Sequence, residues 1–343
     1  MTRLFTEGAE MQDALLSTFS FISSSTVLTN ESANPAISPY YYYISCSTGS
    51  GGHLRKAITA ATEIYVRTRV MIPEVINSDH WPISIWSGTT LVARVGLAAG
   101  TIVFQVMSST TILEASLVSP VQNVWNLLEI YFKLADAPNG RFVLYVDGNK
   151  LCDFTGDTKI ATPATFDSIG WGGDSDREIC IDDIAINDTA GAVDNSYCGD
   201  GIVVKVEPNG NGTHNNWHGS DADDVDNYQM CHEFPKDDDT TYVYHDNTSG
   251  VQQQFAMSHL SFTGYTILRI WAEARARKTA ASAMTLKLGQ LAAGGADVVS
   301  AGRALYTDAY NRVVGDDSFV NPVDTNPWEE ADIDAIEFVA QVT

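Results

Sequence analysis

The sequence is poor in basic residues. Lysine and arginine number 20 against 43 aspartates and glutamates, so the chain of 343 residues carries a formal net charge of −23 at pH 7. Nucleic acids and anionic membranes are polyanions, which such a surface repels, and we expect neither as a partner. The same charge keeps free copies of the chain apart at low salt, so any self-association has to rest on specific apolar contacts.

Cysteine is scarce too, and no stretch has the character of a membrane span or a signal peptide. The five cysteines are widely spaced and odd in number, which excludes complete pairing within one chain and favours thiols in a reducing compartment. Residues 95–113 are uncharged but contain glycines and a Ser-Ser-Thr-Thr run, which is typical of two strands and not of a helix in lipid. Acidic residues stand near the N-terminus, where a signal peptide has its apolar core.

Motifs of the common enzyme classes are missing as well. The sequence has no nucleophile elbow, no Walker loop and no dinucleotide fingerprint, and no strand carries a glutamate pair of the kind that glycosidases use. On these absences we predict that the chain is not an enzyme. A zinc site is not expected either, because the loop is long and polar and its candidate ligands form no compact knuckle; these are His214, His218, Cys231 and His232.

What the sequence has in abundance is short stretches of alternating apolar and polar residues. Residues 62–72 place Ile64, Val66 and Val70 on one side and charged residues on the other. The same period of two recurs at 124–134, 141–146 and 265–277. Further short strands are expected at about 83–86, 89–97, 101–107 and 110–117, between Gly-, Pro- or Ser-rich turns.

This pattern, with a length that exceeds what one core usually supports, predicts an all-β protein of two β-sandwich (jelly-roll) domains. We place the domains at residues 1–195 and 202–343, with a linker between them. Helix is expected only as a short turn near 328–335, where an N-cap candidate, a proline and acidic residues follow one another, with Trp328 internal.

The stretch from Arg141 to Gly191 organises the first domain. A strand leads into a tight turn at Asp147-Gly148, and a later strand at 179–186 has one slip in its alternation, at Asp182-Asp183. We interpret the slip as a β-bulge. The bulge is expected to direct one carboxylate at the turn amides of the loop 170–175 or at a calcium ion.

Several of these segments resemble known families. The Asp-Gly hairpin and the stretch IDDIAIND resemble the closing strands of a laminin-G-like or concanavalin A-like jelly roll, and RLFTEGAE resembles the first strand of such domains in tailed-phage virion proteins. Three segments of the second half resemble the domain that accompanies this module in those proteins: PKDDDTTYV at 235–243, EARARKT at 273–279 and NPVDTNPWEEADIDAIEF at 321–338. The resemblance covers about residues 1–195 and most of the remainder.

The resemblance implies a virion structural protein: a capsid decoration, tail or fibre-associated subunit that acts through protein–protein interfaces. Such a protein is made in the bacterial host cytoplasm, assembles with other virion proteins and forms a homo-oligomer, with a trimer as the expected form. The alternative is a carbohydrate-binding adhesion module that recognises host surface glycans. Lectin-like jelly rolls often bind calcium, which makes a candidate set of Asp174, Asp176, Asp182 and Asp183, with solvated acidic turns as the alternative.

Aromatic residues supply the candidate contacts. The run Tyr40, Tyr41, Tyr42 and Tyr43 is a candidate interface or glycan platform, and the alternative is an edge strand whose alternate rings lie in the core. Trp217, on a long polar loop, is the second candidate anchor. In the adhesion reading, Trp81 and Trp86 are further stacking residues.

Overall fold

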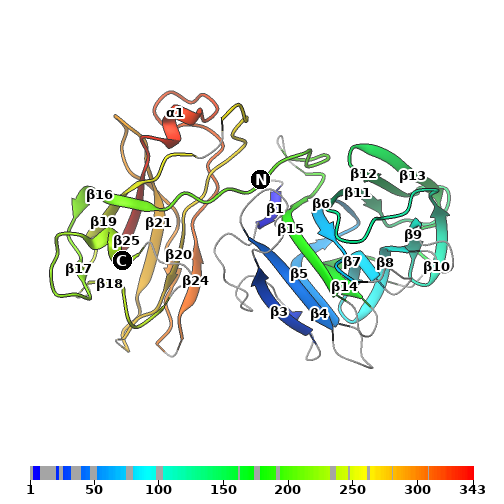
Figure 1. Ribbon diagram of the computed structural model, residues 1–343, viewed down its shortest axis with the longest axis horizontal. Helices are drawn as coiled ribbons and strands as arrows, with labels where there is room; N and C mark the ends of the chain where they lie inside the picture. The colour runs from blue at the N-terminus through cyan, green and yellow to red at the C-terminus, as the bar shows by residue number, and fades with distance from the viewer. Residues whose placement is uncertain are drawn as a thin grey trace. The chain divides into compact units, whose positions relative to one another are not determined.

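The computed structural model divides into two compact units, Met1–Val204 and Lys205–Thr343. It describes residues 3–7, 21–22, 26–31, 40–46, 52–74, 80–97, 103–160, 163–173, 178–190, 194–231, 237–245, 248–260, 263–279, 281–307 and 309–343. Strands account for nearly all regular structure in these ranges, and all strand pairs are antiparallel (Figure 1). The prediction of an all-β, two-sandwich fold is confirmed.

The first unit consists of two sheets packed face to face. In the described chain, sheet A has eight strands, seven of them in the order β13 (Asn149–Gly156), β12 (Gly140–Val146), β11 (Asn126–Lys133), β6 (Glu63–Met71), β15 (Glu178–Asn187), β4 (Tyr41–Cys46) and β3 (Thr26–Glu31). The eighth, β1 (Arg3–Glu7), pairs with β15. Sheet B has seven described strands: β10 (Thr111–Ala115), β9 (Phe104–Ser108), β8 (Thr90–Leu97), β7 (His80–Ser87), β14 (Phe166–Gly173), β5 (Gly52–Ala61) and β2 (Phe21–Ile22).

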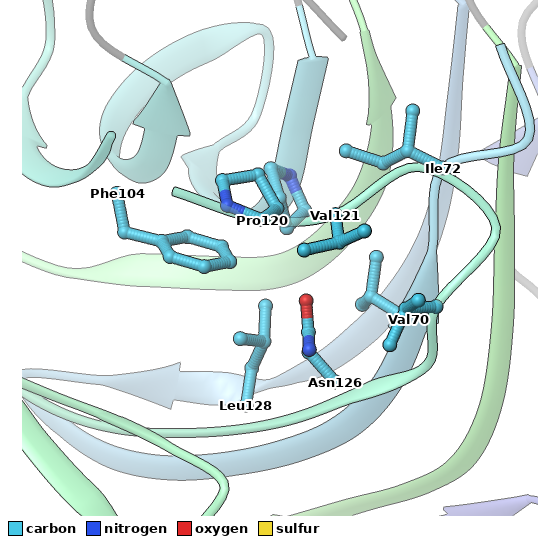
Figure 2. A pocket seen from close by; sticks show the side chains of 9 residues that line it. Val70, Ile72, Phe104, Pro120, Val121, Asn126 and Leu128 are labelled. Atoms are coloured by element: carbon cyan, nitrogen blue, oxygen red, sulfur yellow. The ribbon is translucent and has the colours of Figure 1, made fainter. Parts of the chain in front are cut away.

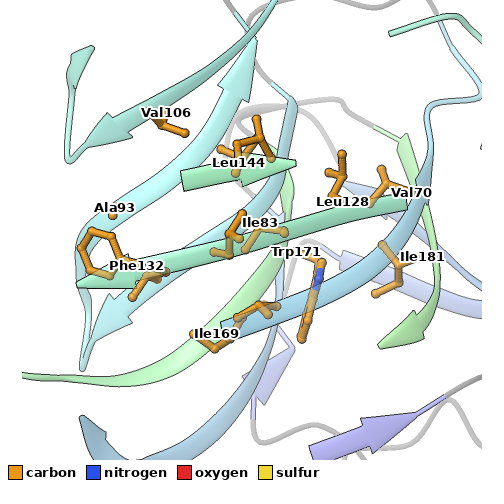
Figure 3. Packing of buried hydrophobic residues seen from close by; sticks show 14 of the residues in the cluster. Val70, Ile83, Ala93, Val106, Leu128, Phe132, Leu144, Ile169, Trp171 and Ile181 are labelled. Carbon is orange, nitrogen blue, oxygen red and sulfur yellow. The ribbon is translucent and has the colours of Figure 1, made fainter. Parts of the chain in front are cut away.

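The core of this unit lies between the two sheets and follows the sequence alternation. Leu128, Phe132 and Leu144 point inward from sheet A and meet Ile169 and Trp171 from sheet B (Figure 3). All of these side chains are fully buried, and each large apolar side chain contributes about 1.5–3 kcal/mol on burial. The alternation at 62–72, 124–134 and 141–146 therefore predicted β6, β11 and β12 correctly.

The slip at Asp182-Asp183 is a bulge, as predicted. The register of β15 against β6 shifts between Asp182 and Ala185, and Asp183 has a φ of 48°, in the left-handed region that aspartate tolerates better than most residues. The expected linker, residues 196–201, and the residues beside it form hydrogen bonds with the first unit. Arg67 donates to the carbonyl of Gly199, and the amide of Val203 donates to the Asp183 carboxylate at 2.7 Å.

The second unit is built on one larger sheet. Its strands run in the order β16 (Pro208–Asn215), β19 (Gln252–Met257), β25 (Glu337–Val342), β21 (Thr285–Leu291) and β22 (Val298–Val299), with β23 (Arg303–Ala304) also on β21. Two short strand pairs accompany it: β17 (His218–Gly219) with β18 (Val243–Tyr244), and β20 (Glu273–Ala276) with β24 (Asn311–Val314). The helical turns are η1 (Asn227–Met230) and α1 (Glu330–Ile333).

Of two predictions for this unit, the short helix is confirmed and the long strand is not. The short helix is confirmed as α1, and Trp328 beside it is buried, with Ile333 and Ile336 in the same cluster. The long strand expected at 265–277 is wrong for most of its length, since only Glu273–Ala276 is a strand and Ile270 makes an isolated bridge with Ser318. In the part of the chain that the structure describes, no helix is long and apolar enough to cross a membrane.

Candidate ligand-binding site

Polar and aromatic side chains gather on the outer face of sheet B, away from the core. Strand β14 runs through the middle of this face, where Gly172 pairs with His53 on β5 and with Trp81 on β7. Two positions along, Gly170 pairs with Arg55 and Ser84. The pairing continues across the next two strands of sheet B: Ser84 pairs with Arg94 on β8, and Arg94 pairs with Met107 on β9. We call this surface the sheet B face and define it by His53, Arg55, Trp81, Ser84, Trp86, Arg94 and Gln105.

The glycines of the stretch FDSIGWGG make room for these side chains. Ile169 and Trp171 point into the core, which leaves Gly170 and Gly172 on the outer face. A Cβ on Gly170 would stand 2.8 Å from the Ser84 hydroxyl and 3.1 Å from the Trp86 indole nitrogen. Glycine in a strand interior often marks such a close approach. The large side chains of the neighbouring strands therefore extend over the backbone of β14, which carries no side chain at these two positions.

Three rings form the centre of the face. The imidazole of His53 stacks on Trp81, with ring centroids 5.2 Å apart and an interplanar angle of 14°, and lies 4.8 Å from the Trp86 ring. The two indoles have centroids 6.5 Å apart. Trp86 is held in orientation by its indole N–H, which donates to the Ser84 hydroxyl at 2.8 Å. Trp81 and Trp86, the two stacking candidates of the adhesion reading, thus lie together.

Two arginines cover the indoles. The guanidinium carbon of Arg55 lies 3.5 Å from the centroid of Trp86, and that of Arg94 lies 4.3 Å from the centroid of Trp81. Arg55 also donates to the carbonyl of Gly88 at 3.0 Å. Partly desolvated cation–π contacts of this kind contribute about 0.5–2 kcal/mol each. They leave Trp81 and Trp86 only 8% and 6% exposed, so the guanidiniums form the outer layer of the face.

Gln105 adds an amide at the β9 end. Its side chain is buried and donates to the carbonyl of Leu97 at 3.2 Å, but the Oε1 atom has no hydrogen-bond partner within the described chain. A buried amide oxygen without a partner costs about 1–3 kcal/mol and is rare in folded proteins. Because the atom is buried, a ligand that donates a hydrogen bond to it has to displace the side chain outward, and the bond would then remove this cost.

The face is locally positive in a strongly acidic chain. Its formal charges are Arg55 and Arg94, and Asp167 is the carboxylate that acts on Arg55. His53 is neutral at physiological pH, because burial, together with the nearby positive charge of Arg55, lowers its pKa to about 4. A neutral imidazole can both donate and accept hydrogen bonds.

The lowered pKa of His53 makes the first unit sensitive to acid. The unfolded chain binds a proton at His53 below pH about 6.5, whereas the folded chain does so only near pH 4, so stability is lost as the pH falls through this window. We expect wild type to lose about 3 kcal/mol more between pH 7 and pH 4 than a His53→Gln variant, in urea unfolding followed at each pH. The control is His259→Gln, at an exposed histidine. If wild type and His53→Gln lose the same stability between pH 7 and pH 4, His53 is not the cause of the acid sensitivity.

The tyrosine run does not form an exposed platform. It belongs to β4, which lies between β15 and β3 and is therefore an inner strand of sheet A, not an edge. Tyr42 is in the core, and Tyr41 is buried on the other side against Trp125, with ring centroids 5.5 Å apart. Tyr40 and Tyr43 are half-buried. The alternation of a strand, which sends successive rings to opposite faces, accounts for this outcome.

Trp217 is not the exposed anchor that its polar loop suggested. It is 8% exposed, packs in the core of the second unit and donates from its indole N–H to the carbonyl of Val251. The exposed rings in this region are Tyr242 and Tyr244, whose centroids are 6.0 Å apart. Neither ring was predicted from the sequence as an exposed contact, although the two stand at alternate positions, as residues on one face of a strand do.

The two described members of the candidate calcium set, Asp182 and Asp183, do not fit a calcium site. The carboxylate of Asp183 lies 3.2 Å from Arg69 and accepts from the Val203 amide, and a cation beside a guanidinium is disfavoured. Asp182 accepts the amide N–H of Asp183. Asp174 and Asp176 lie outside the described residues. Within those that the structure describes, no group of three or more His, Cys, Asp or Glu side chains could hold a metal ion.

The loop residues weighed for zinc have other roles where they are described. His218 pairs with Asp224 at 2.9 Å, and His232 lies outside the described residues. Cys231 is a thiol that forms no disulfide bond with another described residue.

A small pocket lies apart from the sheet B face, at one end of the core. Figure 2 shows Val70, Phe104, Val121 and Leu128 around it, with Asn126 as its polar side chain. Its empty volume is about 230 Å³, including the open solvent at its mouth. Ligand pockets are usually larger and hold several polar groups, so we do not assign a function to this one.

Comparison with known proteins gives a likeness in fold but none in sequence family. No family model and no curated protein matches the chain. Among solved structures, it is similar to the cellulose-induced protein Cip1 (TM-score 0.45, 12% identity, 57% of this chain and 100% of that one). It is also similar to an endo-β-1,4-glucuronan lyase from the fungus Trichoderma reesei (0.44, 10%, 57% and 100%) and to a carbohydrate esterase from the Shiga toxin-encoding bacteriophage phi24B (0.40, 15%, 54% and 97%).

These structures are β-sandwich proteins whose names refer to carbohydrates, and the likeness is one of general fold. They contradict the expectation that the chain is not an enzyme, because a lyase and an esterase are among them. We withdraw that expectation. Its physical weakness is that linear motifs detect only sites built from consecutive residues, whereas a site on a sheet face is assembled across strands by register.

Proposed function

We propose that the sheet B face binds a carbohydrate. The observation that carries the proposal is the group of three rings, His53, Trp81 and Trp86, bordered by the guanidiniums of Arg55 and Arg94 and the amide of Gln105. The hydroxyls of a sugar need hydrogen-bonding groups around them, and the guanidiniums of Arg55 and Arg94, held in place on the indoles, supply donors on the outer side of the face. The unpaired oxygen of Gln105 is an acceptor of the kind that a sugar hydroxyl satisfies.

A binding experiment with two variants tests this proposal. The purified chain is applied to a glycan array, and the tightest oligosaccharide is measured by calorimetry. Trp86→Ala is expected to weaken binding at least tenfold, because the ring lies outside the core cluster and its loss removes the support on which the Arg55 guanidinium stands. Gln105→Met, which keeps side-chain length but removes the amide, is expected to weaken it severalfold.

Trp125→Ala is the matched control, since Trp125 packs on Tyr41 in sheet A, and its affinity should equal that of wild type. Circular dichroism and thermal melting establish that each variant is folded. Unchanged affinity in folded Gln105→Met and Trp86→Ala contradicts the proposal, and so does an array on which no glycan binds.

The setting that we propose for this face is a tailed-phage particle on which the chain recognises host surface glycans. The support is the sequence resemblance, two of whose motifs are far apart in the sequence of the first unit but neighbours in space: Arg3–Glu7 of RLFTEGAE pairs with the end of β15, from Ile184 to Asn187. Partners would then be other virion proteins and further copies of the chain, a trimer among the candidates. Light scattering on the purified chain tests self-association against the monomer mass of 37.2 kDa, and mass spectrometry of intact particles tests the location.

A further inference from the structure

We infer that the glycan recognised by the sheet B face is acidic, with carboxylates that contact Arg55 and Arg94. This inference rests on the proposed carbohydrate function and adds the charge of the ligand to it. It comes from three features of the face: the order of its layers, the directions in which its donors point and its charge relative to the rest of the chain.

The order of the layers is the first argument. The indoles of Trp81 and Trp86 are almost fully covered, and the guanidiniums of Arg94 and Arg55 stand over them at 4.3 and 3.5 Å. A ligand that approaches the face therefore meets positive charge before it meets a ring. A site for neutral sugars would be expected to expose the rings instead, because a C–H surface gains little from a guanidinium.

Donor direction is the second argument. A guanidinium stacked on a ring donates its hydrogen bonds in its own plane, and the geometry of that fork matches a carboxylate, which accepts two parallel bonds. The two guanidiniums stand on neighbouring rings whose centroids are 6.5 Å apart, so both positive charges belong to one part of the face. Two adjacent cations suit a ligand that carries a negative charge on consecutive units, as a polyuronate does.

The third argument concerns the rest of the chain. At a net charge of −23 the protein repels polyanions in general, so an acidic glycan binds only where close contacts offset that repulsion. The sheet B face offers such contacts through the two guanidiniums that stand on its rings, those of Arg55 and Arg94.

Paired ligands test the inference. Hexamers of galacturonic acid and of glucuronic acid are compared by calorimetry with the same hexamers after reduction of their carboxyl groups, at 50 and 300 mM NaCl. We expect an acidic hexamer to bind at least tenfold more tightly than its reduced form, with an advantage that shrinks at the higher salt concentration. Arg55→Gln and Arg94→Gln should each remove most of that advantage, while Arg94→Lys, which keeps the charge but not the fork, should retain part of it.

Arg141→Gln, on the opposite sheet of the same unit, is the matched control and should keep the full preference. Equal binding of acidic and reduced hexamers, both weakened by Trp86→Ala, overturns the acidic-ligand inference and leaves the carbohydrate function standing. A preference for the acidic hexamer that survives both glutamine variants overturns the assignment to Arg55 and Arg94. Failure of every hexamer and every array glycan to bind overturns the inference and the proposed function together.

Discussion

Replacing Asp183 with alanine is expected to lower the free energy of unfolding of the first unit by about 3–5 kcal/mol. The carboxylate is fully buried, pairs with Arg69 at 3.2 Å and accepts the Val203 amide at 2.7 Å. Arg67 binds the carbonyl of the same residue, so the bulge, two arginines of β6 and the segment 194–203 meet at one point. Truncation leaves the Arg69 guanidinium, which is 13% exposed, without this partner and leaves the Val203 amide without its acceptor.

Hydrogen exchange of peptides from β6 and β15, followed in rising denaturant, measures this effect for the first unit. Asp183→Asn keeps an acceptor for Val203 and loses the charge, so it should cost less than alanine. The matched control is Asp188→Ala, whose carboxylate accepts only a local bond from Ala190, and it should change stability by less than about 0.5 kcal/mol. Equal costs at Asp183 and Asp188 would show that the bulge has no special role.

The second large effect is expected in the second unit, where Glu273→Ala should cost about 3–5 kcal/mol. Glu273 and Arg312 are 6% and 7% exposed and form a two-pronged pair, with N–O distances of 2.5 and 2.6 Å. Removal of the carboxylate leaves a buried guanidinium without that compensation. Because replacing a whole buried pair by apolar residues is often neutral, the double variant Glu273→Met with Arg312→Met should regain most of the loss.

Hydrogen exchange of peptides from β20 and β24 gives the measurement. Arg303→Ala serves as the control, since Arg303 and Asp316 are about half exposed and such pairs contribute about 0–1 kcal/mol. A double variant that is less stable than Glu273→Ala alone would contradict this account of the pair.

The two stretches with the clearest alternation show what a sequence reveals about strands. At 62–72 the inward positions are large apolar residues, and β6 forms because their burial repays the ordering of the chain. At 265–277 only the part in which alanines alternate with charged residues, Glu273–Ala276, is a strand. Arginines at alternate positions of the stretch form ion pairs, as between Arg269 and Asp317 and between Arg275 and Asp238. A period of two in the sequence does not by itself distinguish alternation that buries apolar residues from alternation that places charged residues in ion pairs.

The candidate site was only partly visible in the sequence. Trp81 and Trp86 were foreseen as stacking residues, but His53, Arg55, Arg94 and Gln105 were not, because only strand register brings them together. One signal could have found them: the alternating glycines of the FDSIGWGG stretch leave one face of a strand bare, which indicates that neighbouring side chains cover it. The bulge at Asp183 was predicted from local alternation, whereas its partners Arg69 and Val203 are distant in sequence and were not.

A crystal structure of the chain with the oligosaccharide that binds most tightly on the array tests the central claim most directly. The account predicts sugar rings on the outer face of sheet B, in contact with Arg55, Trp86 and Gln105. Electron density elsewhere would contradict it, for example beside the stacked Tyr65 and Tyr131 of sheet A or beside the exposed Tyr242 and Tyr244 of the second unit.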